Sequence, residues 1–433
     1  MKLQQHTKLV FTVLFFSMQF SFGQDLTKGR LLEAGLDSVL VYQKVDSIMQ
    51  LGIKNQAFPG AQLLVAKNSK IIFHKAYGFH TYDSLQKVAL NDVYDLASVT
   101  KITAALPVLM KLYDEDKLDL DAPFSTYWKP WKHKKNKKQL TVREVLAHQA
   151  GLQSYIIFLN EVLKKDGSLK SRFIKTNASN RYSKQAYHGL YVKDRFKHKV
   201  FRQINRSKVS EEKKYLYSGL TFLLYPEIVT QLTGESYTAY LDENFYQPLG
   251  TTTLGFLPKT KNFTNAIVPT EIDPLFRQEL THNYVHDENA ALLGGISGNA
   301  GLFATAMDMT KMMQMYLNYG TFNGKRYFSE ATIKEFTRVQ YPKNGNRRGL
   351  GFDKPSLGND TLPLVKAYPA PEVSAASFGH SGFTGTFVWA DPENKLVFIF
   401  LSNRVYPTRT NRSLYTLTIR SALQQVFYNS VKK

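Results

Sequence analysis

The 433-residue sequence contains no cysteine. This absence excludes disulfide bonds, thiolate metal sites, a cysteine nucleophile and a lipid-modified N-terminal cysteine. Beyond its first 23 residues the chain also lacks a hydrophobic run of the roughly 20 residues that a membrane span needs. It shows neither zinc-finger spacing nor an aromatic RNA-binding strand motif, so we expect no nucleic-acid partner.

Acidic residues are scarce: 35 Asp and Glu face 56 Lys and Arg, which gives a net charge of +21 at pH 7. A basic exported protein can contact nucleic acid, anionic lipid or an anionic wall polymer. We favour plain solubility over any single partner of this kind and leave a weak anionic surface contact open. A hydrophobic content of 43% and an aromatic content of 13% indicate a globular protein rather than a disordered one.

The first 23 residues have the features of a signal peptide. Lys2 and Lys8 precede an apolar run over residues 9–20, and small residues end the segment, which predicts cleavage before Gln24. The run is shorter than a membrane span, although an uncleaved anchor is the alternative. We therefore expect a periplasmic or secreted protein.

The segments near both chain ends predict the fold class. Helical spacing indicates two terminal helices, at 36–51 and 413–428. Strand-like runs around short polar turns indicate two hairpins, at 61–66 with 71–78 and at 378–390 with 395–401. This order predicts one α+β domain over residues 24–433. Its antiparallel sheet is built from both chain ends and flanked by helices, with a mostly helical inserted domain between them.

Local signals mark helix boundaries within the insertion. Pro107 and Pro226 each interrupt an apolar run and predict a bend or break, because proline lacks an N–H group. Thr141 and Glu144 have the spacing of a capping box. Residues 305–308 predict the cap of a methionine-rich helix, whose methionines we interpret as core packing.

Residues 158–214 differ from the rest of the chain. Lysine and arginine are frequent there, acids are few, tyrosine and phenylalanine are interspersed, and periodicity is poor. We interpret this segment as an inserted basic cap, partly loop. Such a cap either selects substrates over an active site or is a surface elaboration without a substrate role.

A serine stands three residues before a lysine at Ser98 and Lys101. Positions i and i+3 share one face of a helix, so the hydroxyl and the amine can approach each other at a helix start. Burial pushes a lysine toward its neutral, basic form, and a serine beside such a base can act as a nucleophile. Alone, this spacing is weak evidence, because chance matches are common in a lysine-rich chain.

Other candidate sites are less convincing. A lone histidine near a glycine-terminated helix, His148, is interpreted as structural. The glycine-rich run 293–301 lacks the Gly-Lys-Ser/Thr ending of a phosphate-binding loop. A group of four potential ligands has neither zinc-protease spacing nor a distant further ligand, so we expect no metal there; its members are His282, His286, Asp287 and Glu288. We also expect no organic cofactor.

Three motifs stand in order along the chain: Ser98-x-x-Lys101, Tyr217-Ser218-Gly219 and His380-Ser381-Gly382. With these motifs the sequence resembles the serine β-lactamase and penicillin-binding-protein superfamily, over nearly the whole mature chain. It is most similar to the class C-like esterases and D-alanyl-D-alanine peptidases, including the hydrolase module that some Bacteroidetes carry fused to a glycoside hydrolase.

The resemblance implies a role for each motif residue. Ser98 would be the acylated nucleophile, Lys101 its general-base partner and Tyr217 a second proton-transfer group. His380 would line the site. The backbone N–H groups of Ser98 and Phe383 would form the oxyanion hole. Whether lysine or tyrosine takes the serine proton stays open.

The same resemblance gives substrate-binding roles to Ser381 and Gly382, and two departures from its pattern stand out. Gly219 replaces the usual Asn or Asp, so no side chain is present there to hold a substrate amide. His380 replaces a common lysine, and a histidine is only partly charged near neutral pH. Its grip on a substrate carboxylate is therefore expected to depend on pH.

The sequence thus predicts an exported serine hydrolase that works through an acyl-enzyme. The favoured substrate is a peptidoglycan-derived peptide, as for a D-alanyl-D-alanine carboxypeptidase, or a related amide or ester. A carboxylesterase and then a β-lactamase are the alternatives. A catalytically inactive module that binds wall fragments is the alternative outside enzymes, and Gly219 is its motivation.

Overall fold

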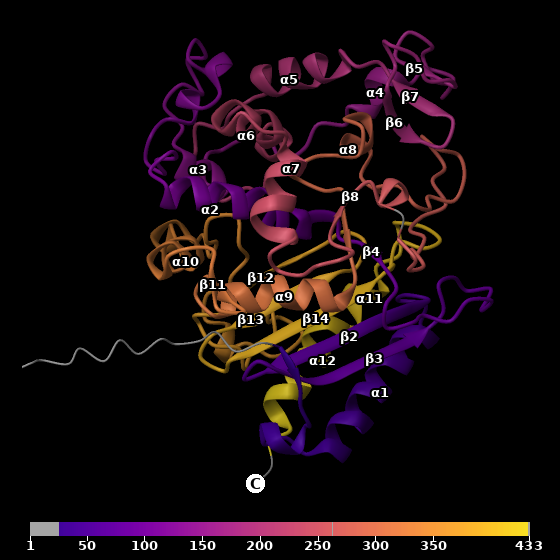
Figure 1. Cartoon of the computed structure of the whole chain (residues 1–433), viewed down its shortest axis with the longest axis vertical. Helices are drawn as coiled ribbons and strands as arrows, with labels where there is room; N and C mark the ends of the chain where they lie inside the picture. The colour runs from indigo at the N-terminus through magenta and orange to yellow at the C-terminus, as the bar shows by residue number, and fades with distance from the viewer. Residues whose placement is uncertain (1–25, 262, 432–433) are drawn as a thin grey trace, which may run out of the picture.

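A computed structural model describes residues 26–261 and 263–431. The predicted signal peptide lies outside these residues. Both ends of the described chain meet in the lower part of the molecule (Figure 1), where the first and last helices lie next to each other. No helix among the described residues is long and apolar enough to cross a membrane.

The core of this lower part is a six-stranded sheet with the order β1-β3-β2-β14-β13-β12. Every neighbouring pair is antiparallel except β1 with β3, which is parallel. The strands are β1 Thr27–Lys28, β2 Gly60–Lys67, β3 Lys70–Gly78, β12 Phe378–Ser381, β13 Phe387–Asp391 and β14 Leu396–Ser402. The predicted sheet from both chain ends is confirmed. The prediction of a single strand over 378–390 is wrong, because a loop over 382–386 divides it into β12 and β13.

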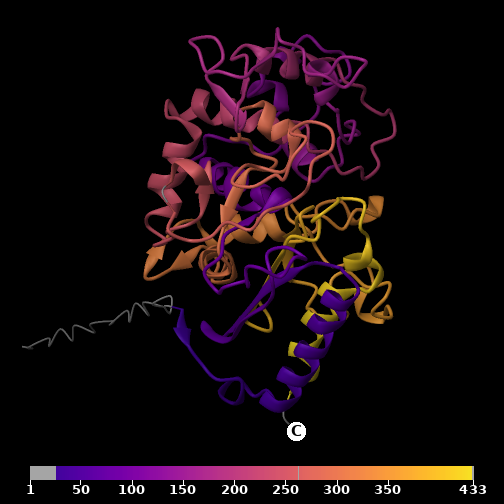
Figure 2. The ribbon, with the colours of Figure 1, turned by 90° about the vertical axis from the view of Figure 1, so that its right-hand side faces the viewer.

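Helices cover both faces of this sheet (Figures 1 and 2). The first face carries α1 Ser38–Lys54 and α12 Ile419–Asn429, and the second carries α9 Ala306–Leu317. Side chains alternate between these faces: Leu63 packs with the α1 side and Leu64 with the α9 side, as the period of two in a strand requires.

The predicted C-terminal helix is interrupted. It consists of α11 Ser413–Thr416 and α12, because Thr418 has a positive φ of 53° that no α-helix accommodates. The predicted N-terminal helix, by contrast, is confirmed as α1.

The inserted part is more mixed than predicted. Its helices are α2 Leu106–Asp114, α3 Val142–Leu146, α4 Leu159–Val162, α5 Phe196–Arg206, α6 Tyr225–Thr233, α7 Tyr237–Leu241, α8 Glu288–Leu292 and α10 Glu330–Thr337. Its strands form three small sheets: β4 Tyr94–Asp95 with β9 Leu302–Ala304 and β8 Gly255–Phe256; β5 Ile174–Lys175 with β7 Leu190–Val192 and β6 Lys184–Tyr187; and β10 Thr321–Phe322 with β11 Lys325–Arg326.

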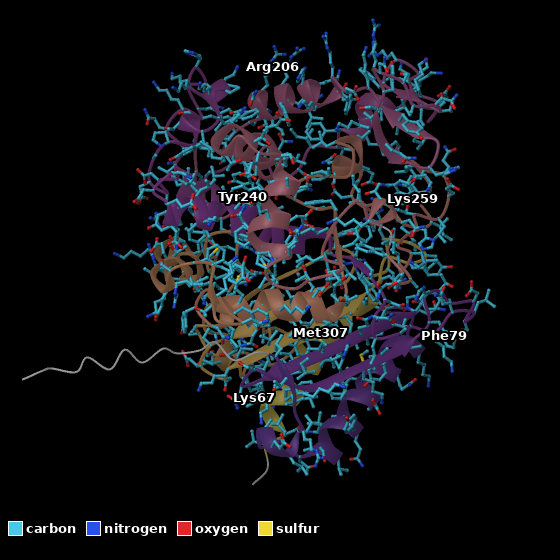
Figure 3. All side chains as sticks on the ribbon, in the orientation of Figure 1. Lys67, Phe79, Arg206, Tyr240, Lys259 and Met307 are labelled. Atoms are coloured by element: carbon cyan, nitrogen blue, oxygen red, sulfur yellow. The ribbon has the colours of Figure 1, made fainter. Side chains whose placement is uncertain are left out.

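The basic cap over residues 158–214 contains α4, α5 and one of these small sheets. Its α5 buries Phe196, Val200 and Ile204 at a spacing of four, so the cap has a helical periodicity that its many lysines obscured. Figure 3 places Arg206, the last residue of α5, at the top of the molecule, away from the large sheet.

The predicted helix signals are confirmed. Thr141 and Glu144 form a reciprocal capping box at α3. Thr305 caps α9, and four methionines of that helix are fully buried core residues: Met309, Met312, Met313 and Met315. Pro226 marks the second position of α6 after a short 3₁₀ turn. Thr141 and Thr305 therefore act through hydrogen bonds to backbone N–H groups at the helix starts, as expected.

Candidate active site

The Ser98 segment is not one regular helix. A 3₁₀ turn over Ala97–Val99 and a π-helical turn over Lys101–Ala105 precede α2. Pro107 cannot donate to the carbonyl of Thr103 four residues earlier, and the Tyr246 hydroxyl donates to that carbonyl instead, at 2.9 Å. The predicted break at Pro107 is confirmed, whereas the prediction that Ser98 and Lys101 begin a regular helix is wrong.

The predicted contact between the Ser98 hydroxyl and the Lys101 amine is nevertheless present. Lys101 Nζ lies 2.9 Å from Ser98 Oγ and 3.1 Å from the carbonyl oxygen of Asn299. The Lys101 side chain is only 2% exposed, while Ser98 is partly exposed. Asn299 belongs to the glycine-rich run 293–301. A Cβ on Gly298 would lie 2.4 Å from the Phe222 carbonyl, so this run approaches its neighbours closely because it has no side chain there.

The backbone before Ser98 is held in an unusual conformation. Ala97 has a positive φ of 44°, which is strained for a residue with a Cβ. The buried Asp95 carboxylate stabilises this turn by accepting the N–H groups of Ala97, at 2.8 Å, and His286, at 2.7 Å. Burial raises the pKa of Asp95. The nucleophile candidate thus projects from a strained, hydrogen-bonded turn.

Tyr217 lies beside Lys101, with the lysine nitrogen 5.3 Å from the centre of its ring. Three further side chains surround the ring: His148 at 4.5 Å, Arg348 at 5.4 Å and His380 at 6.1 Å. The phenol oxygen is buried and has no hydrogen-bond partner among the described residues. The three predicted motifs therefore meet around one buried phenol.

His380 lies on β12 and is buried. Its Nδ1 lies 2.7 Å from the carbonyl oxygen of Ser381, which can only accept, so Nδ1 carries the proton and Nε2 is the basic nitrogen. Burial, with the charges of Arg348 and Lys101 next, lowers the pKa of His380 to about 3. The prediction that His380 is partly charged near neutral pH is wrong, because a buried imidazole among cations stays neutral.

The loop after β12 is tied to the segment that leads to Ser98. The hydroxyl of Thr384 donates to the Asp95 carbonyl at 2.8 Å, and that of Thr386 donates to the Leu96 carbonyl at 3.2 Å. A Cβ on Gly382 would lie 2.6 Å from the same Leu96 oxygen, so only glycine permits this approach. These contacts tie the loop that carries Phe383 to the residues just before Ser98, and Phe383 itself is 44% exposed.

Gly219, the last residue of the Tyr217-Ser218-Gly219 motif, faces open space where a side chain would lie. Gly219 donates its N–H to the Ser154 carbonyl at 3.2 Å, and a Cβ added to it would meet no atom within 4 Å. The position could therefore accept a side chain, and its glycine is not required by packing.

Sequence reasoning missed two features of the site. His148, interpreted as structural, contacts Tyr217 and accepts the N–H of Ser218 at Nδ1, at 3.2 Å. Burial lowers its pKa well below the usual value, with Arg348 and Lys101 adding to the effect. Arg348 is 2% exposed and forms an ion pair with Asp353 at 3.0 Å. Neither residue has a spacing that links it to Ser98.

The four potential metal ligands are engaged with other partners. His286 bonds Glu271 at 2.9 Å, Asp287 caps α8, and Glu288 pairs with Arg409 at 2.7 Å. His282 contacts the Ile267 carbonyl at 2.8 Å. Within residues 26–261 and 263–431, no cluster of three or more histidine, aspartate or glutamate side chains could hold a metal ion.

Comparisons with known proteins identify the family of the chain. The beta-lactamase family model matches residues 43–422. A protein of Escherichia coli O157:H7, provisionally named a D-alanyl-D-alanine carboxypeptidase, is 30% identical over 375 residues, which cover 80% of this chain and 79% of that protein.

Two solved structures show a similar fold. A class C beta-lactamase matches with a TM-score of 0.62 and 15% identity, covering 89% of this chain and 96% of its own. EstCE1, a hydrolase with promiscuous acyltransferase activity, matches with a TM-score of 0.61 and 16% identity, covering 89% and 98%.

Proposed function

Because the chain belongs to the beta-lactamase family and is a serine hydrolase, we propose that Ser98 attacks a substrate carbonyl and forms an acyl-enzyme. The observation that carries the proposal is the 2.9 Å contact between Lys101 Nζ and Ser98 Oγ. The same amine lies 5.3 Å from the centre of the Tyr217 ring. A serine hydroxyl needs an adjacent base to become a nucleophile, and the Lys101 amine is within hydrogen-bonding distance of it.

The reaction has two halves. As the Ser98 oxygen bonds to the carbonyl carbon, its proton passes to the Lys101 and Tyr217 pair, and the same pair protonates the departing amine or alcohol. Water then attacks the ester, gives up a proton to that pair, and releases the acid while Ser98 regains its proton. The N–H groups of Ser98 and Phe383 stabilise the oxyanion in both halves. The ties between Thr384 and Asp95 support this placement of Phe383.

The proposed substrate is a peptide that ends in D-alanyl-D-alanine, by analogy with the carboxypeptidase name of the relative. Ser381 and Gly382 would bind it along the edge of β12. With His380 neutral, the charges that face a substrate carboxylate come from its neighbours, not from that imidazole. The signal-like residues 1–23 support export to the compartment that holds such peptides.

Carboxylesterase activity is the second candidate. Gly219 favours it, because this position offers no side-chain amide to hold the amide of a peptide substrate. β-Lactamase activity ranks third, because a β-lactam also carries an amide that the missing side chain at Gly219 would hold.

Turnover by the purified mature chain tests the proposal. We expect release of D-alanine from a D-Ala-D-Ala peptide to exceed hydrolysis of a cephalosporin, with a short acyl ester as the third substrate. A chain that hydrolyses only the ester is an esterase. A chain that neither turns over these substrates nor becomes labelled at Ser98 by a fluorophosphonate would be the inactive binding module.

A further inference from the structure

A groove of about 390 Å³ lies between helix α5 of the basic cap and the segment before α3. Lys134 and Trp128 line it from that segment, and α5 contributes His198, Arg202 and Arg206. We refer to the space between these side chains as the basic groove. Figure 3 labels Arg206 at the top of the molecule. No residue of the three motifs around Ser98 lines the groove.

Helix α5 presents one continuous face to the basic groove. The residues of this face follow one another three or four positions apart, as neighbours on one side of a helix do; they are His198, Phe201, Arg202, Asn205 and Arg206. Because a helix rises 1.5 Å per residue, His198, Arg202 and Arg206 succeed one another about 6 Å apart along its axis. The groove therefore has a row of hydrogen-bond donors along one wall.

The cations of the basic groove differ from their neighbours on the same helix. Elsewhere on α5, Lys197 pairs with Glu227 and Lys199 pairs with Glu161. Among the residues that the structure describes, neither Asp nor Glu lines the groove, and three of its cations form no ion pair: Lys134, Arg202 and Arg206. Their positive potential is therefore available to an anionic ligand.

Hydrogen bonds and ring packing fix the two walls of the groove against each other. Trp128 Nε1 and Trp131 Nε1 both donate to Asn205 Oδ1, at 2.7 and 3.0 Å. The Trp128 ring packs edge to face with Phe201, with the ring centres 5.4 Å apart. The groove is thus formed without a ligand, which lowers the entropic cost of binding one.

The shape and the donors of the groove favour one kind of anionic partner. A guanidinium binds a carboxylate through two parallel hydrogen bonds, so a row of such donors suits a chain with an anionic group on successive units. Single-stranded nucleic acid stacks its bases on exposed aromatic faces, whereas Trp128 is only 6% exposed. A flat bilayer would meet the rims of the groove rather than its interior.

We propose that the basic groove binds a linear polysaccharide that carries carboxylate groups. Arg202 and Arg206 each bind a carboxylate of the chain, and Lys134 binds it from the opposite wall. The inference does not depend on the proposed hydrolysis at Ser98, so Ser98→Ala should bind the polysaccharide as tightly as the wild type does.

Calorimetric titration of the mature chain with an oligogalacturonate at low salt tests this inference. Arg202→Gln with Arg206→Gln should weaken binding at least about tenfold, because two charge-assisted contacts are lost. Lys197→Gln with Lys199→Gln is the matched control. It removes the same charge from the same helix, but from lysines that already have carboxylate partners, and should weaken binding less than about twofold.

A second measurement needs no variant of the groove. Bound oligogalacturonate should protect Lys134 of the wild type from acetylation by an amine-reactive ester. Lys214 is the reference, because its side chain is 79% exposed and lies outside the groove; its acetylation should not change. Thermal unfolding reports whether the arginine variant is folded, and if it is not, the protection of Lys134 carries the test.

Three results would overturn the inference. Equal losses of affinity in the two double variants would show attraction by overall charge and not by the groove. Absence of binding by the wild type, or binding without protection of Lys134, would place no polysaccharide in the groove. Stronger binding of anionic phospholipid vesicles or of a single-stranded oligonucleotide, lost on Arg202→Gln with Arg206→Gln, would assign the groove to that partner instead.

Discussion

The basic cap and the surroundings of Ser98 both contain cationic side chains. Those of the cap are partly exposed to water, whereas those beside Ser98 are buried in the protein. In the cap, Lys197 and Lys199 pair with Glu227 and Glu161 while their side chains stay 40% and 34% exposed. At the site, Lys101 and Arg348 are each 2% exposed. Exposed pairs contribute about 0–1 kcal/mol, whereas a buried charge changes the chemistry of every neighbour.

This comparison indicates that net charge is a poor guide to function in this chain. The cap is visible in the sequence because its lysines are numerous, yet the cations that lie beside Ser98 and Tyr217 are the buried Lys101 and Arg348.

Lys101→Met should lower the rate of Ser98 labelling by at least about 10³-fold, because the nucleophile loses its adjacent base. Lys111→Met is the control, since Lys111 lies on the following helix α2 and pairs with Glu115 near the surface. Ser98→Ala sets the background. Equal losses in Lys101→Met and Lys111→Met, measured as second-order labelling rates, would contradict a catalytic role for the buried amine.

Tyr217→Phe should lower kcat by about 10²-fold with little change in the free energy of unfolding. The phenol oxygen has no hydrogen-bond partner to lose among the described residues, while a proton-transfer group contributes about 10²–10⁴-fold. Tyr225→Phe removes another buried, unpartnered hydroxyl and should leave kcat unchanged. Unchanged turnover in Tyr217→Phe would exclude the phenol from proton transfer.

His380→Asn should flatten the dependence of stability on pH between about 3 and 6.5. The pKa of His380 is about 3 in the folded protein and about 6.5 in an unfolded chain. In that window the unfolded state therefore binds the extra proton, and wild-type stability falls as pH falls, by up to about 1.4 kcal/mol per pH unit.

Urea unfolding at pH 5 and pH 7 measures this effect as the difference between the two free energies of unfolding. His188→Asn, an exposed position in the cap, is the control and should behave as wild type. Parallel pH curves for wild type and His380→Asn would show that the imidazole is not kept neutral by burial.

Neutralising the cap should have the smallest effect. Arg202→Gln with Arg206→Gln removes two exposed charges of α5, and we expect ester turnover to change less than about twofold and the free energy of unfolding by less than about 0.5 kcal/mol. A tenfold loss of turnover on a peptide substrate, with ester turnover intact, would instead show that the cap selects substrates.

The sheet was predictable because its strands are local patterns. The runs around Asn68 and Ser69 and around the turn at Asp391 alternate or are continuously apolar, and both became antiparallel pairs. The C-terminal helix was predicted less well, since the break at Thr418 is set by its positive φ and not by any loss of apolar spacing.

The site was predictable only in part. Ser98 and Lys101 share a local spacing, so their contact follows from almost any helical turn. His148 and Arg348 reach the same phenol from distant segments, and the sequence contains no period that links them. The glycine-rich run was excluded as a nucleotide site, but its use, a carbonyl that accepts from Lys101, was visible only in three dimensions.

Contacts between residues close in the chain set the strands, the caps at Thr141 and Thr305, and the Ser98 and Lys101 pair, so these features follow from local sequence alone. Tertiary structure decided which charges are removed from water, and so the protonation state of His380 and the contact of Arg348 with Tyr217. The reason is physical, because solvation depends on everything that packs around a group, and most of those atoms come from remote parts of the chain.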